Sequence, residues 1–292
     1  MRFGSSRPEA ARSKFRLMKP DEKRPDAWLC SYPKSGRTWM RFALSNLIEE
    51  TFDLGVDIDT ANMFGLIPND DGPDHTRPWK TIDNFSYGDH QGLPLIAMSH
   101  LPRDDRFASI PVVLLIRNPA ASLVSRFFHM SRHAGQFEGG LPEFARDEFY
   151  GVPGIVHYFS SWEPHLDDPN VEVVSYEELR SEPLEPFGRI ARQLGIQADD
   201  AALEKALDAA RVDRMRAVEK KSGVGQPNEY DRNDPGALRV RKASATGWRD
   251  EIDEETLEFL IRSLEEDRAA RSLLERFGLM PDSPAVEPCP NR

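Results

Sequence analysis

The sequence predicts an α/β protein with a central, mostly parallel sheet and helices on both of its faces. Four short apolar runs, at 28–32, 93–98, 112–116 and 171–175, have the length and composition of strands in the interior of a protein. Amphipathic stretches with a helical period alternate with these runs along the chain. Such alternation is typical of a parallel sheet, because the connection between two parallel strands needs room for a helix.

The helices are predicted between the strands and after the last of them. One begins near Thr38 and carries apolar residues through to Ile48, and a second covers 119–130. Asn118 is a good N-cap for that second helix, and Pro119 suits its first position. Further helical periods occupy 155–166, 184–194, 201–210 and 252–277. The stretches 51–92 and 220–238 are rich in Gly, Pro, Asn and Asp, so they are predicted to be loops.

The chain is expected to form one domain over 26–280. Residues 1–25 hold eight Lys or Arg against three acids and show no period, so they are interpreted as a flexible arm. Residues 281–292 contain several prolines and are interpreted as a disordered tail. With 292 residues, the chain is long enough to bury a sizeable core.

Composition narrows the classes of function. The formal net charge of −11 argues against a general nucleic-acid binder, although nine acids within 250–267 show that this charge is unevenly spread. No apolar run approaches the roughly 20 residues of a membrane-spanning helix, and the N-terminus lacks the apolar core of a signal peptide. Cys30 and Cys289 make neither a disulfide framework nor a metal site. We therefore expect a reduced, cytoplasmic protein with Cys30 in its core.

The long predicted loop at 51–92 is a candidate lid or substrate-binding wall. Loops of this length in a compact domain are often functional. This one carries the aromatic residues Phe64, Trp79, Phe85 and Tyr87. They either line a substrate pocket or form a satellite core under the loop, and the sequence favours neither interpretation.

The most informative stretch is 28–39, where a strand, a loop and a helix are predicted in succession. Lys34, Ser35, Gly36 and Thr38 lie where the helix begins. Backbone N–H groups at a helix start have no internal partner, and the helix dipole adds positive charge there, so this turn suits an anion. Gly36 allows close approach of a ligand to the backbone. The stretch lacks the glycine that precedes the lysine in a Walker A motif, so it is not one.

Chemically active residues follow three of the predicted strands. Lys34 follows the first strand, His100 follows the second, and Arg117 follows the third. In parallel α/β sheets, ligands bind beyond the carboxyl ends of the strands. The three residues are therefore expected to meet in a single site that handles an anion.

Other candidate residues are ambiguous when taken alone. Ser125, two helical turns beyond Arg117, could share a phosphate with it, although a strand-end arginine is more often part of a surface ion pair. The basic segment 239–249 could close over an anion or be a solvated turn. His100 has the intrinsic pKa of a general base, yet a lone histidine is more often structural. Tyr176 fits a core tyrosine as well as it fits a residue that contacts a ligand. We interpret His129 and His133 as structural.

Taken together, these segments resemble the sulfotransferase family of the cytosolic type. The stretch 32–39 matches the family's Tyr-Pro-Lys-Ser-Gly-Thr-Thr-Trp except at Arg37. Arg117 and Ser125 have the spacing of its 3′-phosphate motif, and 99–102 resembles the segment around its catalytic histidine. Arg241, Lys242 and Trp248 match its Arg-Lys-Gly-x-x-Gly-x-Trp-Lys segment, with Arg249 keeping the final charge. The resemblance covers about 27–249.

The resemblance implies a three-layer, P-loop-like fold and transfer of a sulfuryl group from 3′-phosphoadenosine 5′-phosphosulfate (PAPS). His100 would accept the proton of the acceptor, and Lys34 would stabilise the departing phosphate without any metal. The acceptor would offer a hydroxyl group, or as a second choice an amine, on a small molecule, a carbohydrate or a glycolipid. The implied nucleotide-binding residues are Lys34, Ser35, Gly36, Arg37, Thr38, Trp39, Arg117, Ser125, Tyr176, Arg241, Lys242 and Ala243.

Several positions depart from the family pattern. Ala243 and Thr246 replace two glycines, Met98 stands where many members have lysine, and Val212 occupies the place of an aromatic residue beside the adenine. The family's C-terminal dimer motif is not found, so a homodimer has no support in the sequence. These departures keep two alternatives open. One is a nucleotide or small-molecule kinase that needs Mg²⁺ and ATP, and the other is an inactive nucleotide-binding module.

Overall fold

The computed structural model describes residues 15–18, 25–70, 79–82, 90–222 and 244–281. Within them, four parallel strands form one sheet in the order β4-β2-β5-β6. These are β2 (Ala27–Ser31), β4 (Ile96–Ser99), β5 (Val112–Ile116) and β6 (Val171–Ser175). The predicted α/β class with a central parallel sheet is therefore confirmed. The strand predicted at 93–98 begins later, after Pro94, which has no N–H to give to a ladder.

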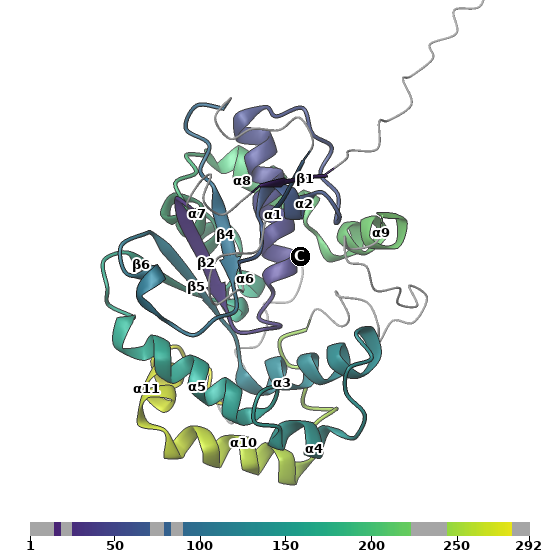
Figure 1. Cartoon of the computed structure of the whole chain (residues 1–292), viewed down its shortest axis with the longest axis vertical. Coiled ribbons are helices and arrows are strands. Elements are labelled where there is room, and N and C mark those ends of the chain that lie inside the picture. The colour runs from purple at the N-terminus through teal and green to yellow at the C-terminus, as the bar shows by residue number, and fades with distance from the viewer. Residues whose placement is uncertain (1–14, 19–24, 71–78, 83–89, 223–243, 282–292) are drawn as a thin grey trace, which may run out of the picture.

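Helices cover both faces of this sheet and make three layers (Figure 1). One layer contains α1 (Arg37–Phe52), α7 (Leu184–Gln193) and α8 (Asp200–Ala209). The other contains α3 (Pro119–Phe128), α5 (Val152–Trp162), α10 (Glu254–Glu266) and α11 (Arg268–Arg276). Because side chains alternate along a strand, Leu29 packs in the core of the first layer, and Trp28 and Cys30 pack in the core of the second.

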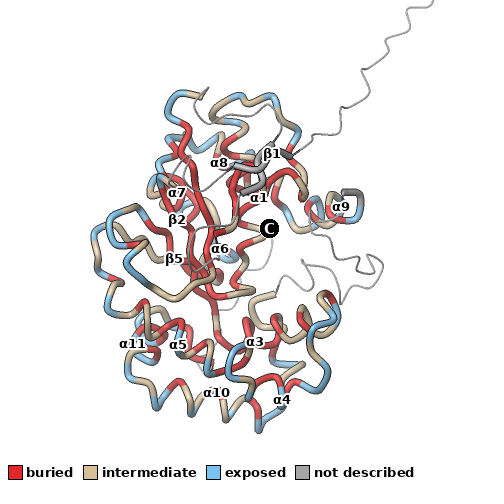
Figure 2. Tube along the Cα trace, viewed as in Figure 1, coloured by how far each residue is buried: buried red, intermediate tan, exposed pale blue. Residues whose placement is uncertain are grey.

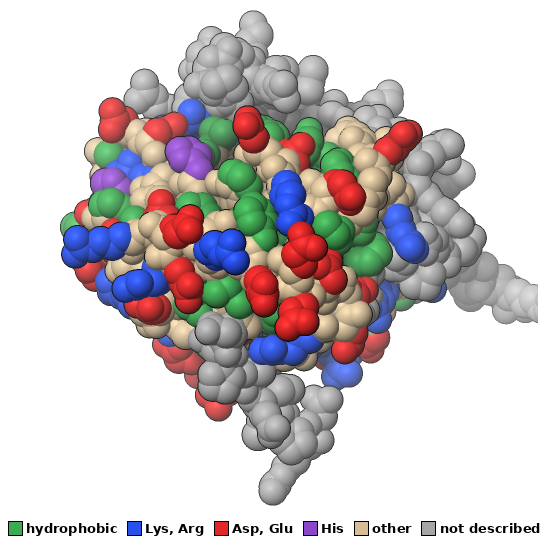
Figure 3. Space-filling view, turned by 90° about the horizontal axis from the view of Figure 1, so that it is seen from below, with side chains coloured by type: hydrophobic (Ala, Val, Ile, Leu, Met, Phe, Trp, Pro, Cys, Tyr) green, Lys and Arg blue, Asp and Glu red, His purple; other side chains and the backbone are tan. Residues whose placement is uncertain are grey.

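Figure 2 shows that the buried residues run along the strands and along the sides of the helices that face them. Burial on both faces explains why these strands are continuously apolar in sequence. In α10, Leu260 and Leu264 are buried while most other residues are partly or fully exposed. The face of the molecule seen in Figure 3 accordingly carries acidic and basic side chains side by side. No helix within the described ranges is long and apolar enough to cross a membrane.

The structure also contains regular elements where loops were predicted. Inside 51–92 it has α2 (Met63–Leu66) and β3 (Trp79–Ile82). Strand β3 pairs antiparallel with β1 (Phe15–Met18), which lies within the predicted flexible arm. These elements rely on pairing between distant segments, which local composition does not reveal. The rest of the arm, all of the tail except Pro281, and the predicted loop aromatics Phe85 and Tyr87 lie outside the described residues.

The predicted helices are present with shifted ends. Helix α3 stops at Phe128 and continues as a π-helix, η3 (His129–His133). The helix predicted at 252–277 divides at Asp267, whose side chain caps α11 by accepting from the N–H of Ala270. Five elements complete the described chain: η2 (Asp105–Phe107), α4 (Leu141–Arg146), η4 (Glu163–His165), α6 (Tyr176–Ser181) and α9 (Val212–Ser222). Helix α9 includes the start of the loop predicted at 220–238.

Candidate active site

A cavity of about 300 Å³ lies at the carboxyl ends of β2, β4 and β5. Lys34, His100 and Arg117 all line it. Strand β2 has β4 on one side and β5 on the other, so the residues that follow these three strands come out at the same edge of the sheet. The structure thus brings together the three residues that the sequence placed at strand ends.

The loop between β2 and α1 directs the helix start at this cavity. Lys34 has φ = 74° and Gly36 has φ = 97°, both in the left-handed region. Gly36 is the N-cap of α1, and no side chain within the described residues caps that helix end. A β-carbon on Gly36 would lie 2.7 Å from Cδ2 of Tyr176, so the close packing there requires glycine. Arg37, Thr38 and Trp39, the first residues of α1, all line the cavity.

Ser35 is the one predicted loop residue that the structure does not bring into the cavity. Its side chain is fully buried, and Oγ has no hydrogen-bond partner within the described residues. Its N–H donates to the carbonyl of Tyr32 at 3.3 Å. Contact between the Ser35 hydroxyl and a phosphate therefore stays a prediction.

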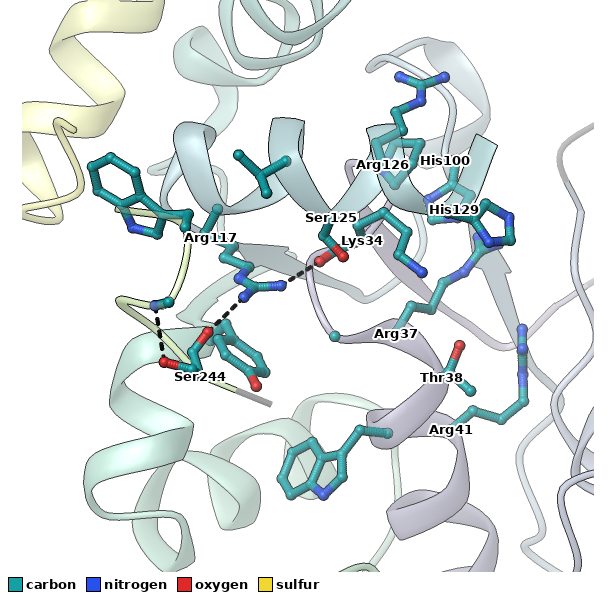
Figure 4. Close-up of a pocket in the computed structure, with 18 of the residues that line it drawn as sticks. Lys34, Arg37, Thr38, Arg41, His100, Arg117, Ser125, Arg126, His129 and Ser244 are labelled. Atoms are coloured by element: carbon teal, nitrogen blue, oxygen red, sulfur yellow. Dashed lines mark hydrogen bonds between the residues drawn. The ribbon is translucent and has the colours of Figure 1, made fainter. Parts of the chain in front are cut away.

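Arg117 joins three separate parts of the site. Its guanidinium donates from Nη1 to the carbonyl of Lys34 at 2.8 Å and from Nη2 to the carbonyl of Ser244 at 3.0 Å (Figure 4). It also lies over the ring of Tyr176, with Cζ 4.4 Å from the ring centroid. Arg117 is 9% exposed, so the surface ion pair that the sequence left open as an alternative does not describe it. Two backbone carbonyls and an aromatic face hold it, and they leave its charge available to an anion in the cavity.

Glu177 lies close to Arg117, and its side chain is partly buried. Its Oε1 accepts from the N–H of Asn118 at 3.1 Å, while Oε2 has no hydrogen-bond partner in the described structure. Burial raises the pKa of Glu177 above its usual value, and the positive charge of Arg117 opposes this shift. Asn118 in turn caps α3 by accepting from the N–H groups of Ala120 and Ala121, as predicted.

Of the other residues in the family motifs, some line the cavity and others lie outside the described residues. Ser125 and Trp248 line the cavity, and Tyr176 closes it beside Arg117. Trp39 donates from Nε1 to the carbonyl of Ala210 at 2.8 Å, which fixes its ring. Val212 lines the cavity as well, so an aliphatic side chain stands where the family has an aromatic one. Arg241, Lys242 and Ala243 lie outside the described residues.

His100 is held in one orientation by the backbone. Its Nδ1 lies 2.7 Å from the carbonyl oxygen of Ser31, at the end of β2. A carbonyl can only accept, so Nδ1 carries a proton and the lone pair of the neutral ring is on Nε2. This tautomer is the one that a general base at Nε2 requires.

Several residues that the sequence analysis passed over also line the cavity. His129, at the junction of α3 and η3, was interpreted as structural, yet it faces the cavity and stacks on His133 at 4.6 Å between ring centroids. Arg41 and Asn69 form another part of the wall, together with Phe64, one of the loop aromatics that the sequence left open between a pocket wall and a satellite core; Phe64 lines the cavity and also packs against the core. Arg41 follows Arg37 by one helical turn, and that spacing was the available signal for placing both on one face of α1.

The labelled residues divide into two sides (Figure 4). The Arg117 side consists of Arg117, Ser125 and Ser244, together with Tyr176, whose ring faces the Arg117 guanidinium. The Arg41 side consists of Arg37, Arg41 and His129, together with Phe64 and Asn69, which contact Arg41. Lys34 and His100 lie toward the Arg41 side.

Arg126 also lines the cavity, but neutral tyrosines hold its guanidinium. It donates to the hydroxyl of Tyr32 and lies over the rings of Tyr32 and Tyr150, at 5.1 and 5.2 Å. Burial raises the pKa of Tyr32 above its usual value, with Arg126 acting in the opposite direction. The phenol therefore stays neutral at ordinary pH.

Comparison with known proteins identifies the class. The family model described as "Sulfotransferase domain" matches residues 24–271. The chain belongs to the sulfotransferase family, as the sequence motifs indicated. It is accordingly a sulfotransferase.

The similarity extends over most of the chain. Flavonol 3-sulfotransferase of Flaveria bidentis is 23% identical over 269 residues, covering 85% of this chain and 83% of the relative. Flavonol 4′-sulfotransferase of Flaveria chlorifolia is 26% identical over 266 residues, covering 85% and 81%. The crystal structure of mouse sulfotransferase SULT7A1 complexed with PAP superposes with a TM-score of 0.59 at 20% identity, covering 87% of this chain and 90% of that one. Retinol dehydratase in complex with retinol and PAP gives a TM-score of 0.60 at 18% identity, covering 84% and 82%. These superpositions confirm the P-loop-like fold.

Proposed function

We propose that this chain transfers the sulfuryl group of PAPS to a hydroxyl group of a small-molecule, carbohydrate or glycolipid acceptor, with His100 as the general base. The observation that carries this proposal is the hydrogen bond from His100 Nδ1 to the carbonyl of Ser31, which assigns the ring lone pair to Nε2. The base stands in the same cavity as Lys34 and the start of α1. Acid–base and anion-binding groups therefore share one site.

The donor would lie along the Arg117 side. Arg117 and Ser125 would hold its 3′-phosphate, and Trp39 and Val212 would contact the adenine. Tyr176 would close the pocket beside Arg117. The 5′ end would reach Lys34, with the N–H groups at the start of α1 directed toward it. This arrangement follows the polarity of the site, because each phosphate meets a full positive charge or a helix start.

In the transfer step, the bond between sulfur and the bridging oxygen of the donor breaks while a bond forms between sulfur and the acceptor oxygen. The proton of the acceptor hydroxyl moves to Nε2 of His100. Lys34 stabilises the negative charge that develops on the departing phosphate oxygen. The products are a sulfate ester, PAP and a protonated histidine. Groups that are fixed before the reaction stabilise such charge without reorganising, so the held orientation of His100 matters.

A ligand-stability experiment tests the donor assignment first. Thermal unfolding of the full chain is compared with PAP, with ADP and with Mg²⁺-ATP at matched concentrations. A ligand at 100 times its Kd stabilises the folded state by about 2.7 kcal/mol, which is readily detected. Stabilisation by PAP above ADP supports the 3′-phosphate pocket and is followed by an acceptor screen with PAPS. Stabilisation by Mg²⁺-ATP alone would contradict the proposal in favour of a kinase.

A further inference from the structure

We infer that Arg37 is a further catalytic residue, which binds oxygens of the sulfuryl group while that group passes from the donor to the acceptor. This inference rests on the proposed function, because it takes Lys34 as the partner of the departing phosphate and His100 as the base. It sharpens the general assignment of Arg37 to the nucleotide, since the sulfuryl group is present in PAPS and absent from PAP.

Arg37 is placed by the same turn that places Lys34. It is the first residue of α1 and directly follows Gly36, the N-cap, which has φ = 97°. Its side chain is only 8% exposed, and both it and Lys34 line the cavity. The loop thus brings two positive side chains, from positions three residues apart, to one cavity.

The start of α1 combines several sources of positive potential. A helix start carries the positive end of the helix dipole and favours acidic residues in its first turn. The first turn of α1 contains no acidic residue and begins with Arg37. PAPS brings two linked negative groups to this end of the site, the 5′-phosphate and the sulfate bonded to it. Lys34 and Arg37 therefore supply one full positive charge for each of them.

The direction of the Arg37 side chain places its charge beyond the phosphate. In Figure 4 it extends from the start of α1 past Lys34, toward His129 and His100, and away from Arg117. The proposed donor runs from its 3′-phosphate at Arg117 to its 5′ end at Lys34, and the acceptor hydroxyl lies at His100. The sulfuryl group has to pass between Lys34 and His100, and Arg37 points into that part of the cavity.

The chemistry of the transfer suits a guanidinium at this place. The bond between sulfur and the bridging oxygen breaks, the bond between sulfur and the acceptor oxygen forms, and the acceptor proton goes to Nε2 of His100. Arg37 stays charged throughout, because its pKa is above about 12, so it neither gives nor takes a proton. Its planar fork of N–H groups can bind two oxygens at once and keep the sulfuryl group in line between the two oxygens that exchange it.

The test compares wild type with Arg37→Thr in the full chain. Threonine is the residue that the family motif has at this place, so the loop accommodates it. Without an acceptor, calorimetry is expected to show about tenfold weaker binding of PAPS, as for the loss of one charged hydrogen bond, and a change of less than about threefold for PAP. With an acceptor from the screen, kcat is expected to fall by about tenfold to 100-fold.

Further variants separate a catalytic from a structural role. Arg37→Lys keeps the charge but not the fork, so its kcat should lie between those of Arg37→Thr and wild type, and it provides the same comparison if Arg37→Thr fails to fold. Methylguanidinium is expected to raise kcat for Arg37→Ala but not for wild type, which a misfolded loop would not show. Arg180→Gln is the matched control, because Arg180 lines the same cavity from the exposed end of α6 and its loss should affect PAP and PAPS alike.

Two results would overturn the inference while leaving the proposed function intact. One is a kcat for Arg37→Thr within about threefold of wild type, and the other is an equal loss of affinity for PAP and PAPS. Failure of PAP to bind the wild-type chain would overturn the proposed function, and this inference with it. The two failures are thus seen in separate titrations.

Discussion

The Arg117 side and the Arg41 side of the cavity are built in different ways. The residues of the Arg117 side come mainly from the ends of β5 and β6 and the helices that follow them, so local sequence places them. The Arg41 side depends on α1 meeting Phe64 and Asn69, which lie in a stretch predicted to be an irregular loop. The Arg117 side is therefore encoded in short motifs, whereas the Arg41 side is encoded in packing between distant segments.

Removal of His100 should have the largest effect, because this residue is the proposed general base. His100→Ala is expected to lower kcat by about 100-fold or more, the usual contribution of a general base, with PAP affinity nearly unchanged. His100→Asn is the sharper variant, since its amide can still donate to the carbonyl of Ser31 but offers no basic nitrogen. Both kcat and the Kd for PAP are measured with an acceptor from the screen. A His100→Ala enzyme that keeps more than about a tenth of the rate would exclude the base assignment.

Sequence reasoning placed the sheet and the strand ends correctly for the same reason that it located Lys34, His100 and Arg117. A buried parallel strand is short and continuously apolar, and the residue after it must leave the sheet at the carboxyl edge. The glycine at position 36 also has a non-local cause, because an added β-carbon would lie against Tyr176, which follows a different strand far along the chain.

The wall at Arg41 could not be predicted in this way. Strand β3 exists by pairing with β1, more than sixty residues earlier in the chain. Arg41 is ordered by Ile67 and Asn69, which no period or cap in the sequence connects to α1. His129 enters the cavity at a π-helix, where the regular spacing of an α-helix fails to predict which side a residue faces.

A variant at Arg117 tests whether the Arg117 side binds the 3′-phosphate of the donor. Arg117→Ala is expected to weaken PAP binding by about 100-fold, because it removes a charged partner of the phosphate and releases the carbonyls of Lys34 and Ser244. Binding of ADP, which has no 3′-phosphate, should change far less. Arg117→Lys should not restore PAP affinity, since one ammonium group cannot span both carbonyls. Equal losses for PAP and ADP would contradict the assignment of the 3′-phosphate to Arg117.

A variant at Gly36 tests how far the loop depends on its backbone conformation. Gly36→Ala places a β-carbon at positive φ and 2.7 Å from Tyr176, so the unfolding free energy is expected to fall by about 2 kcal/mol. Gly55→Ala is the matched control. Gly55 has φ = +67° with nothing within 4 Å of an added β-carbon, so it carries the conformational strain without the clash. Urea unfolding that shows equal losses in both variants would exclude a role for packing against Tyr176.

The smallest expected effect is a change in how folding stability depends on pH, and it concerns Glu177, which lies close to Arg117. Burial raises its folded-state pKa above the ordinary 4.5, against the opposing charge of Arg117. Between these two values the folded state binds more protons than the unfolded state, so wild-type stability falls as pH rises through that window. Glu177→Gln keeps an acceptor for the N–H of Asn118 but does not titrate. The stability of the variant relative to wild type should therefore increase as pH rises above about 4.5. Urea unfolding at several pH values between 4 and 7 measures this difference, with Glu258→Gln on the exposed side of α10 as the control. If the stabilities of wild type and Glu177→Gln changed with pH in parallel, the raised pKa of Glu177 would be contradicted. The charge of Arg117 would then fully offset the effect of burial on that pKa.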